Sequence, residues 1–105
     1  MIKNFQPKRS EQIAFTITFS SAVNFSSFEL AAKKNYSDTE FSIYRNLSNG
    51  ITRISDTTYQ ITIPTSNLEY TTYIYDIRVM LNNVAYFPLS GRITVKPQVY
   101  EVYNG

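Results

Sequence analysis

The sequence predicts an all-β fold, specifically an antiparallel immunoglobulin-like β-sandwich of about seven strands. Ile, Val and Thr together number 28, with seven Phe and nine Tyr, whereas Ala and Leu number five each, a composition that favours strands. Apolar and polar residues alternate over short segments, with turn-forming residues about every eight to twelve positions. No segment carries the spacing of an amphipathic helix. A small closed barrel satisfies the same observations.

A chain of 105 residues suits a single domain. We expect this domain to span residues 12–97, between an N-terminal arm of residues 1–11 and a C-terminal tail of residues 98–105. The tail alternates in the manner of a strand, so it could extend a sheet of this domain or the exposed sheet edge of a neighbouring protein. Tyr100 and Tyr103 in this tail are therefore candidate protein-interaction residues, since exposed tyrosines are enriched at interfaces.

The N-terminal arm is basic and irregular. Lys3, Lys8 and Arg9 precede the first acidic residue, Glu11, and Pro7 interrupts regular strand pairing. We expect an extended arm that becomes ordered only on an adjoining protein, which makes the three basic residues candidate interaction residues. An ordinary disordered terminus is the alternative.

The first half of the domain predicts three strands. The clearest begins at Ile13, where apolar and small polar residues alternate as far as Ser20. After a break of small residues, alternation returns over residues 28–32 and again over residues 41–47. Ser48-Asn49-Gly50 then ends the third strand, because Asn and Gly both tolerate positive φ.

The second half predicts a short strand over residues 51–54 and another over residues 59–63 that Pro64 stops. After a polar crossover, residues 71–81 form the longest extended stretch. Asn82-Asn83 turns the chain so that residues 84–89 pair back as a hairpin. Pro88 and Gly91 then mark a kink or bulge, and the edge continues to Val95.

Tyr73 stands near the start of this long strand, five residues after Leu68. A tyrosine in this place can bond back to upstream backbone and fix the crossover, which is the tyrosine corner of sandwich domains. We therefore assign Leu68 and Tyr73 a structural role.

Counting residues excludes much of enzyme chemistry. The chain has no histidine and no cysteine, so it cannot form a Ser-His-Asp triad, a Cys-His pair, a disulfide or a Cys/His zinc site. A catalytic role for Asp76 would need a second carboxylate or a base nearby, and the sequence specifies none. An outward ion pair of Asp76 with Arg78, Arg45 or Arg92 is the simpler explanation of this residue. We expect no enzyme, no cofactor and no metal.

Charge and hydropathy exclude other classes. Ten Lys and Arg against eight Asp and Glu give a net charge of +2, far from the basic excess that nucleic-acid binding requires. The first residues lack the apolar core of a signal peptide, and apolar runs are short. We expect a soluble protein made in the cytoplasm, without a membrane span or a small-molecule ligand.

The last third of the sequence carries a family resemblance in Tyr75-Asp76-Ile77, Leu89-Ser90-Gly91 and Ile93-Thr94-Val95. It resembles modules of phage tail and baseplate proteins similar to the N-terminal domain of lactococcal phage baseplate upper proteins. There a Tyr-Tyr-Asp-Leu strand precedes a Leu-Leu-x-Gly bend and a Thr-Val-Thr strand. This chain departs from the pattern at Thr71-Thr72, where the family has glycine, and at the Asn82-Asn83 turn, which is Gly-rich in the family.

The resemblance implies a structural virion protein of a bacteriophage, synthesised in the cytoplasm of its host. Because one domain accounts for nearly all of these residues, we expect an accessory role, first as a capsid auxiliary or decoration protein on the major capsid protein. A tail or baseplate component is the second assignment. A carbohydrate-binding or host-adhesion module is the alternative from another class, with tyrosines and loop residues such as Asn49 and Asn82 around a sugar.

Overall fold

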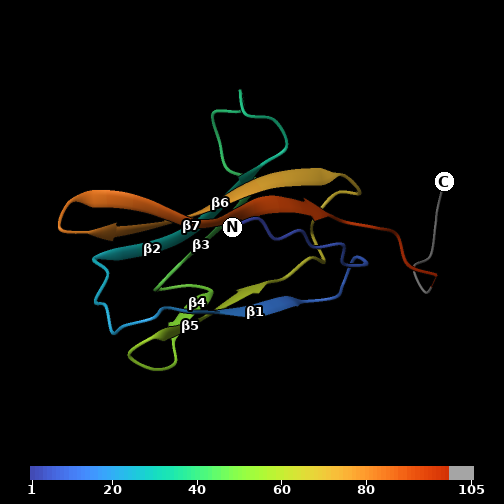
Figure 1. Ribbon diagram of the computed structural model, residues 1–105. Helices are drawn as coiled ribbons and strands as arrows, with labels where there is room; N and C mark the ends of the chain where they lie inside the picture. Colours follow the sequence, from blue (N-terminus) through green and yellow to red (C-terminus); the bar gives the residue numbers. More distant parts are fainter. Residues whose placement is uncertain (100–105) are drawn as a thin grey trace.

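The computed structural model describes residues 1–99, and these form two antiparallel sheets packed face to face, without a helix (Figure 1). The predicted all-β sandwich of about seven strands is thereby confirmed. The strands are β1 (Ile13–Thr18), β2 (Ser27–Lys33), β3 (Ile43–Asn46), β4 (Ile51–Arg53), β5 (Thr58–Ile63), β6 (Thr72–Leu81) and β7 (Val84–Thr94).

The strand order is β1-β5-β4 in one sheet and β3-β2-β6-β7 in the other. Equating β1 to β7 with strands B, C, C′, D, E, F and G gives the order of an immunoglobulin sandwich. The strands form two separate sheets and not the small closed barrel that the sequence also allowed. The loop between β2 and β3 projects away from the upper sheet in Figure 1 and forms a wall beside it.

The core lies between the sheets and follows the predicted alternation. In β2, β5 and β6 every second residue is buried, because successive side chains of a strand point to opposite faces. At one end, Phe28 and Tyr59 stack with ring centroids 4.6 Å apart. At the β3 edge, the guanidinium Nε of Arg45 donates to the backbone oxygen of Thr62 in the other sheet at 2.8 Å, which ties the layers together.

The β6–β7 hairpin turns at Asn82 and Asn83, whose φ angles of 51° and 65° suit a type I′ turn. Ile77 pairs with Leu89, but Val79 pairs with Tyr86, so β7 has one extra residue at this point. The predicted irregularity at Pro88 is therefore a β-bulge.

The N-terminal arm lies along β7 of its own domain. This corrects our expectation that the arm becomes ordered only on an adjoining protein. Lys3 N donates to Ser90 O and Phe5 N donates to Arg92 O, both at 2.9 Å, in a parallel arrangement. The ring of Phe5 packs 4.9 Å from that of Phe15. The arm forms this pairing because β7 is an edge strand whose outward backbone groups need partners.

Candidate functional site

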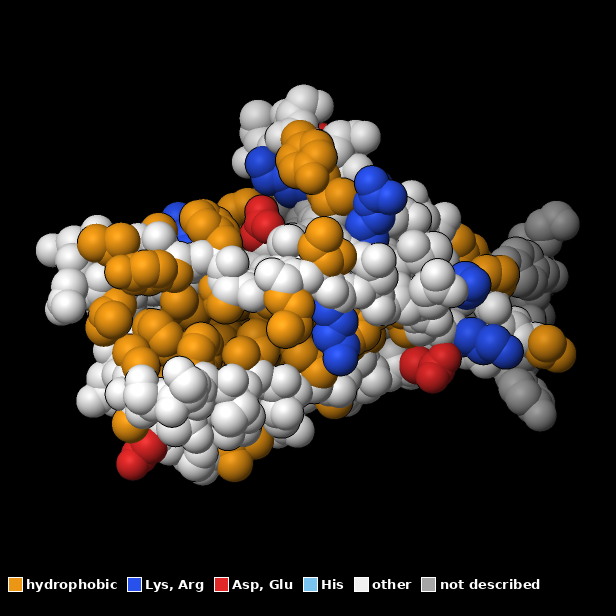
Figure 2. All heavy atoms as spheres, in the orientation of Figure 1, with side chains coloured by type: hydrophobic (Ala, Val, Ile, Leu, Met, Phe, Trp, Pro, Cys, Tyr) orange, Lys and Arg blue, Asp and Glu red, His pale blue; other side chains and the backbone are white. Residues whose placement is uncertain are grey.

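The outer surface of the four-stranded sheet is hollowed, and we call this hollow the outer face. Strands β2, β6 and β7 form its floor, the β2–β3 loop forms one wall, and the start of the arm forms another. Its volume is about 630 Å³. The charged side chains that line it are Glu29, Lys33, Asp76, Arg78 and Arg92, and the larger apolar ones are Ile2, Tyr36, Phe41, Ile74, Tyr75 and Phe87. Figure 2 shows side chains of both charges beside hydrophobic ones beneath the projecting loop.

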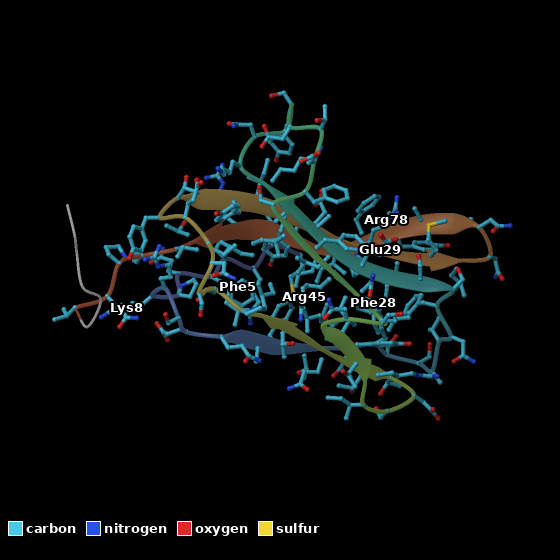
Figure 3. All side chains as sticks on the ribbon, turned by 180° about the vertical axis from the view of Figure 1, so that it is seen from behind. Phe5, Lys8, Phe28, Glu29, Arg45 and Arg78 are labelled. Carbon is cyan, nitrogen blue, oxygen red and sulfur yellow. The ribbon has the colours of Figure 1, made fainter. Side chains whose placement is uncertain are left out.

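Glu29 organises the floor of the outer face. One carboxylate oxygen accepts from the Tyr44 hydroxyl at 2.5 Å, and the other accepts from the guanidinium of Arg78 at 2.9 Å. Arg78 lies on β6 directly opposite Glu29 on β2, and Figure 3 shows the two side chains together. These two hydrogen bonds hold the pKa of Glu29 below its ordinary value, and the bond to Glu29 raises the pKa of Tyr44.

Three aromatic rings stand exposed at the rim of the outer face. The residues are Tyr36 at 84% exposed, Phe41 at 55% and Phe87 at 60%. Phe41 stacks on Tyr44 with an interplanar angle of 7°, and the ammonium of Lys33 lies 5.7 Å from its ring centre. Exposed rings near charges of both signs resemble the composition of protein interfaces more than that of an ordinary solvated surface.

Asp76 projects into this face but makes no ion pair within residues 1–99, which corrects the expected pairing with an arginine. Its backbone lies opposite Ala31 and Ser90. Arg78 is instead bound to Glu29, and Arg45 bonds inward to the opposite sheet. The register of β2 against β6 decides this, because it places Glu29 across from Arg78 and the uncharged Ala31 across from Asp76.

The basic residues of the arm lie along the sandwich edge. Lys3 Nζ lies 5.7 Å from the Phe5 ring, and the Arg9 guanidinium lies 4.3 Å from the Tyr70 ring. The Lys8 backbone N donates to Glu11 at 2.8 Å. These three do not line the outer face, and their role in binding a partner stays a prediction. Tyr100 and Tyr103 lie outside the described residues.

Tyr73 is buried, and its hydroxyl accepts a hydrogen bond from the Glu69 backbone N at 3.0 Å. Leu68 is partly buried and packs against the core. This contact across four residues fixes the crossover into β6, which is the geometry of a tyrosine corner. Its role here is structural.

The loop residues considered for sugar binding lie elsewhere. Asn82 forms the β6–β7 turn, and Asn49 exchanges backbone hydrogen bonds with Asn46 in the β3–β4 turn. Neither lines the outer face. Sequence reasoning missed this face because its residues come from four separate segments. The available signal was the excess of tyrosine and phenylalanine over what one small core needs.

Among residues 1–99, no cluster of three or more Asp and Glu side chains is placed to hold a metal ion. In the same part of the chain, no helix is long and apolar enough to cross a membrane. The lining of the outer face offers contact surface, hydrogen-bonding groups and charge. Comparison with known proteins found no family model that matches the chain and no curated sequence that matches it.

Proposed function

We propose that this protein is a non-enzymatic structural component of a bacteriophage virion that binds another virion subunit through the outer face. The observation that carries the binding role is the hollow itself, about 630 Å³ in volume, with exposed aromatic rings above a charged floor. Burial of these rings against a partner would supply the binding free energy, and no bond would be made or broken.

The charges of the face favour a protein as the partner. Lys33 and Arg92 supply positive charge, while Asp76 supplies a carboxylate without an ion pair in the described residues. A polyanion would be repelled by Asp76 and would find few cations, whereas a folded protein can present a basic side chain to Asp76 and acidic ones to its neighbours. Apolar side chains of that partner would cover Phe41 and Phe87.

The virion assignment comes from the resemblance of Tyr75-Asp76-Ile77 and Leu89-Ser90-Gly91 to phage tail and baseplate modules. A capsid decoration protein is the first assignment, because such a protein acts by surface burial alone. A tail or baseplate component is the second, because the resemblance points there. Both use the same face and differ in copy number.

Mass spectrometry of purified particles from the source of this chain tests the proposal. A ratio to the most abundant shell subunit near one supports capsid decoration, and a few copies per particle supports the tail or baseplate. Absence from particles would overturn the virion assignment. Binding of the purified protein to a glycan array, lost on substitution of the rim rings, would then favour host adhesion.

A further inference from the structure

The edge strands of this sandwich differ in how well they are protected. In the described residues, β4 is three residues long and carries Arg53, and β3 is four residues long and carries Arg45. The second half of β7 is covered by the arm, and its first half is interrupted by the bulge at Pro88. Short length, charge, proline, bulges and covering segments are the usual means by which edge strands avoid pairing with other chains.

Within residues 1–99, strand β1 has none of these protections. It is the outermost strand of the three-stranded sheet within residues 1–99, and it runs regularly for six residues, Ile13–Thr18. No charged residue stands between Glu11 and Glu29, which is the longest uncharged stretch of the chain. Its sequence contains no proline, and it pairs with β5 without a bulge.

Among the described strands, β1 pairs only with β5, so its other side has no strand partner there. Phe19 N donates to Thr57 O, which makes this pair hydrogen-bonded. Hydrogen-bonded and non-hydrogen-bonded pairs alternate along an antiparallel ladder, so the backbone groups of residues 14, 16 and 18 point away from β5. Thr16 is the centre of this set, and the set is therefore symmetric about it.

An apolar seam lies beside this edge. Phe15 and Ile17 face the core yet are only half-buried, and the Phe5 ring of the arm packs against Phe15. Beyond the arm, Val84 is 49% exposed and Tyr86 is 51% exposed on β7. Figure 2 shows hydrophobic side chains visible between the two layers on this side of the molecule.

We infer that the occupant of this edge is a second copy of the chain, paired antiparallel through β1 across a two-fold axis at Thr16. This register joins residue 14 of one copy to residue 18 of the other and sets Phe15 opposite the second copy's Ile17. Such aromatic and β-branched cross-strand pairs stabilise sheets. The two three-stranded sheets become one continuous sheet, and the interface is isologous, as in most homodimers.

Charge favours β1 over β3 and β4 as the edge that pairs with a second copy. Each copy brings the same uncharged edge, so the pairing leaves no charged side chain of β1 desolvated or opposite a like charge. Pairing of two chains through β4 would bring Arg53 of one copy near Arg53 of the other, and pairing through β3 would bring the two Arg45 residues together. Of these three edges, β1 is the one on which self-association has the least electrostatic cost.

Single-cysteine variants test this pairing, because the chain has no cysteine of its own. Thr16 and Thr52 both lie opposite Gln60, on the two edges of the same sheet, so Thr52→Cys is a matched control for Thr16→Cys. A two-fold axis at Thr16 brings the paired Cα atoms within the range of about 4.4–6.8 Å that a disulfide needs. We expect Thr16→Cys to form a disulfide-linked dimer at least about tenfold faster than Thr52→Cys under mild oxidation.

Light scattering of the unmodified protein across a concentration series gives a second measurement. We expect a dimer whose association weakens about tenfold in Thr16→Lys, while Thr52→Lys has no such effect. Circular dichroism should show both lysine variants folded. A protein that stays monomeric at about 100 μM, or equal crosslinking of the two cysteine variants, would overturn the inference; so would a dimer insensitive to Thr16→Lys.

Discussion

Gly91 on β7 lies directly against the backbone of Lys3, and a Cβ added at Gly91 would overlap the Lys3 carbonyl oxygen. The same oxygen accepts a hydrogen bond from the Tyr75 hydroxyl at 2.5 Å. Position 91 therefore needs glycine so that the arm can approach β7 closely. The close packing of the arm on β7 thus explains the glycine of the Leu89-Ser90-Gly91 motif.

Substitution of Gly91 by alanine should loosen the arm. We expect Gly91→Ala to lower the free energy of unfolding by about 1–3 kcal/mol, because the backbone of Lys3 must move to make room. Urea denaturation measures the loss, and hydrogen exchange should show faster exchange of the Phe5 amide. Ser90→Ala is the neighbouring control and should change stability by less than about 0.5 kcal/mol. A Gly91→Ala protein with parental stability and a protected arm would contradict this.

Tyr75 should make the protein sensitive to alkali. Burial raises the pKa of Tyr75 to about 12, whereas an unfolded tyrosine titrates near 10. The folded state therefore holds this proton more tightly, and the stability that it contributes is present below pH 10 and lost between pH 10 and 12. We expect Tyr75→Phe to lose less stability than the parent between pH 9 and 11, measured by urea denaturation at each pH. Equal slopes for the two proteins would contradict the assignment.

Glu29 should contribute stability at neutral pH and none in acid. Its pKa is lowered by hydrogen bonds from Tyr44 and Arg78, so its contribution is present above pH 4.5 and falls as the pH drops through the lowered value. At pH 7 we expect Glu29→Gln to cost about 0.5–1.5 kcal/mol. At pH 2 the difference should vanish. Glu40→Gln, at an exposed loop position, is the control and should leave the free energy of unfolding unchanged at both pH values.

Arg45 should hold the two sheets together at the β3 edge. Its guanidinium donates to Thr62 O at 2.8 Å and occupies the space that a side chain at Gly50 would fill. We expect Arg45→Ala to cost about 1.5–3 kcal/mol in thermal or urea unfolding, as for other hydrogen bonds to charged groups. Arg92→Ala, an exposed arginine on the outer face, should cost less than about 0.5 kcal/mol. If Arg45→Ala lost no more stability than this small amount, the contact between the sheets would contribute nothing.

Phe87 should matter for partner binding and not for stability. It is 60% exposed at the rim of the outer face, so Phe87→Ser leaves the core intact. We expect its incorporation into particles to fall at least about tenfold, as at other interface anchors. Ile54→Ser is the matched control, since Ile54 is 56% exposed and does not line the face. Normal incorporation of Phe87→Ser would count against the outer face as the binding surface.

The strands and most of their ends follow from local sequence pattern. Every second residue of β5 and β6 is apolar, and this alternation is a local property of extended chain in which one face is buried. Pro64 ends β5 because proline lacks the N–H that a ladder needs. Asn82 and Asn83 set the tightest turn because asparagine tolerates positive φ.

The folded arrangement of the strands sets which strands meet and which side chains share a surface. Arg78 binds Glu29 instead of Asp76 because the β2–β6 register sets Glu29 opposite it. The irregular arm pairs with β7 because Gly91 leaves room for Lys3. The outer face joins side chains from segments far apart in the chain. Strand formation depends on neighbours in sequence, whereas register, edge cover and shared surfaces depend on contacts between distant residues.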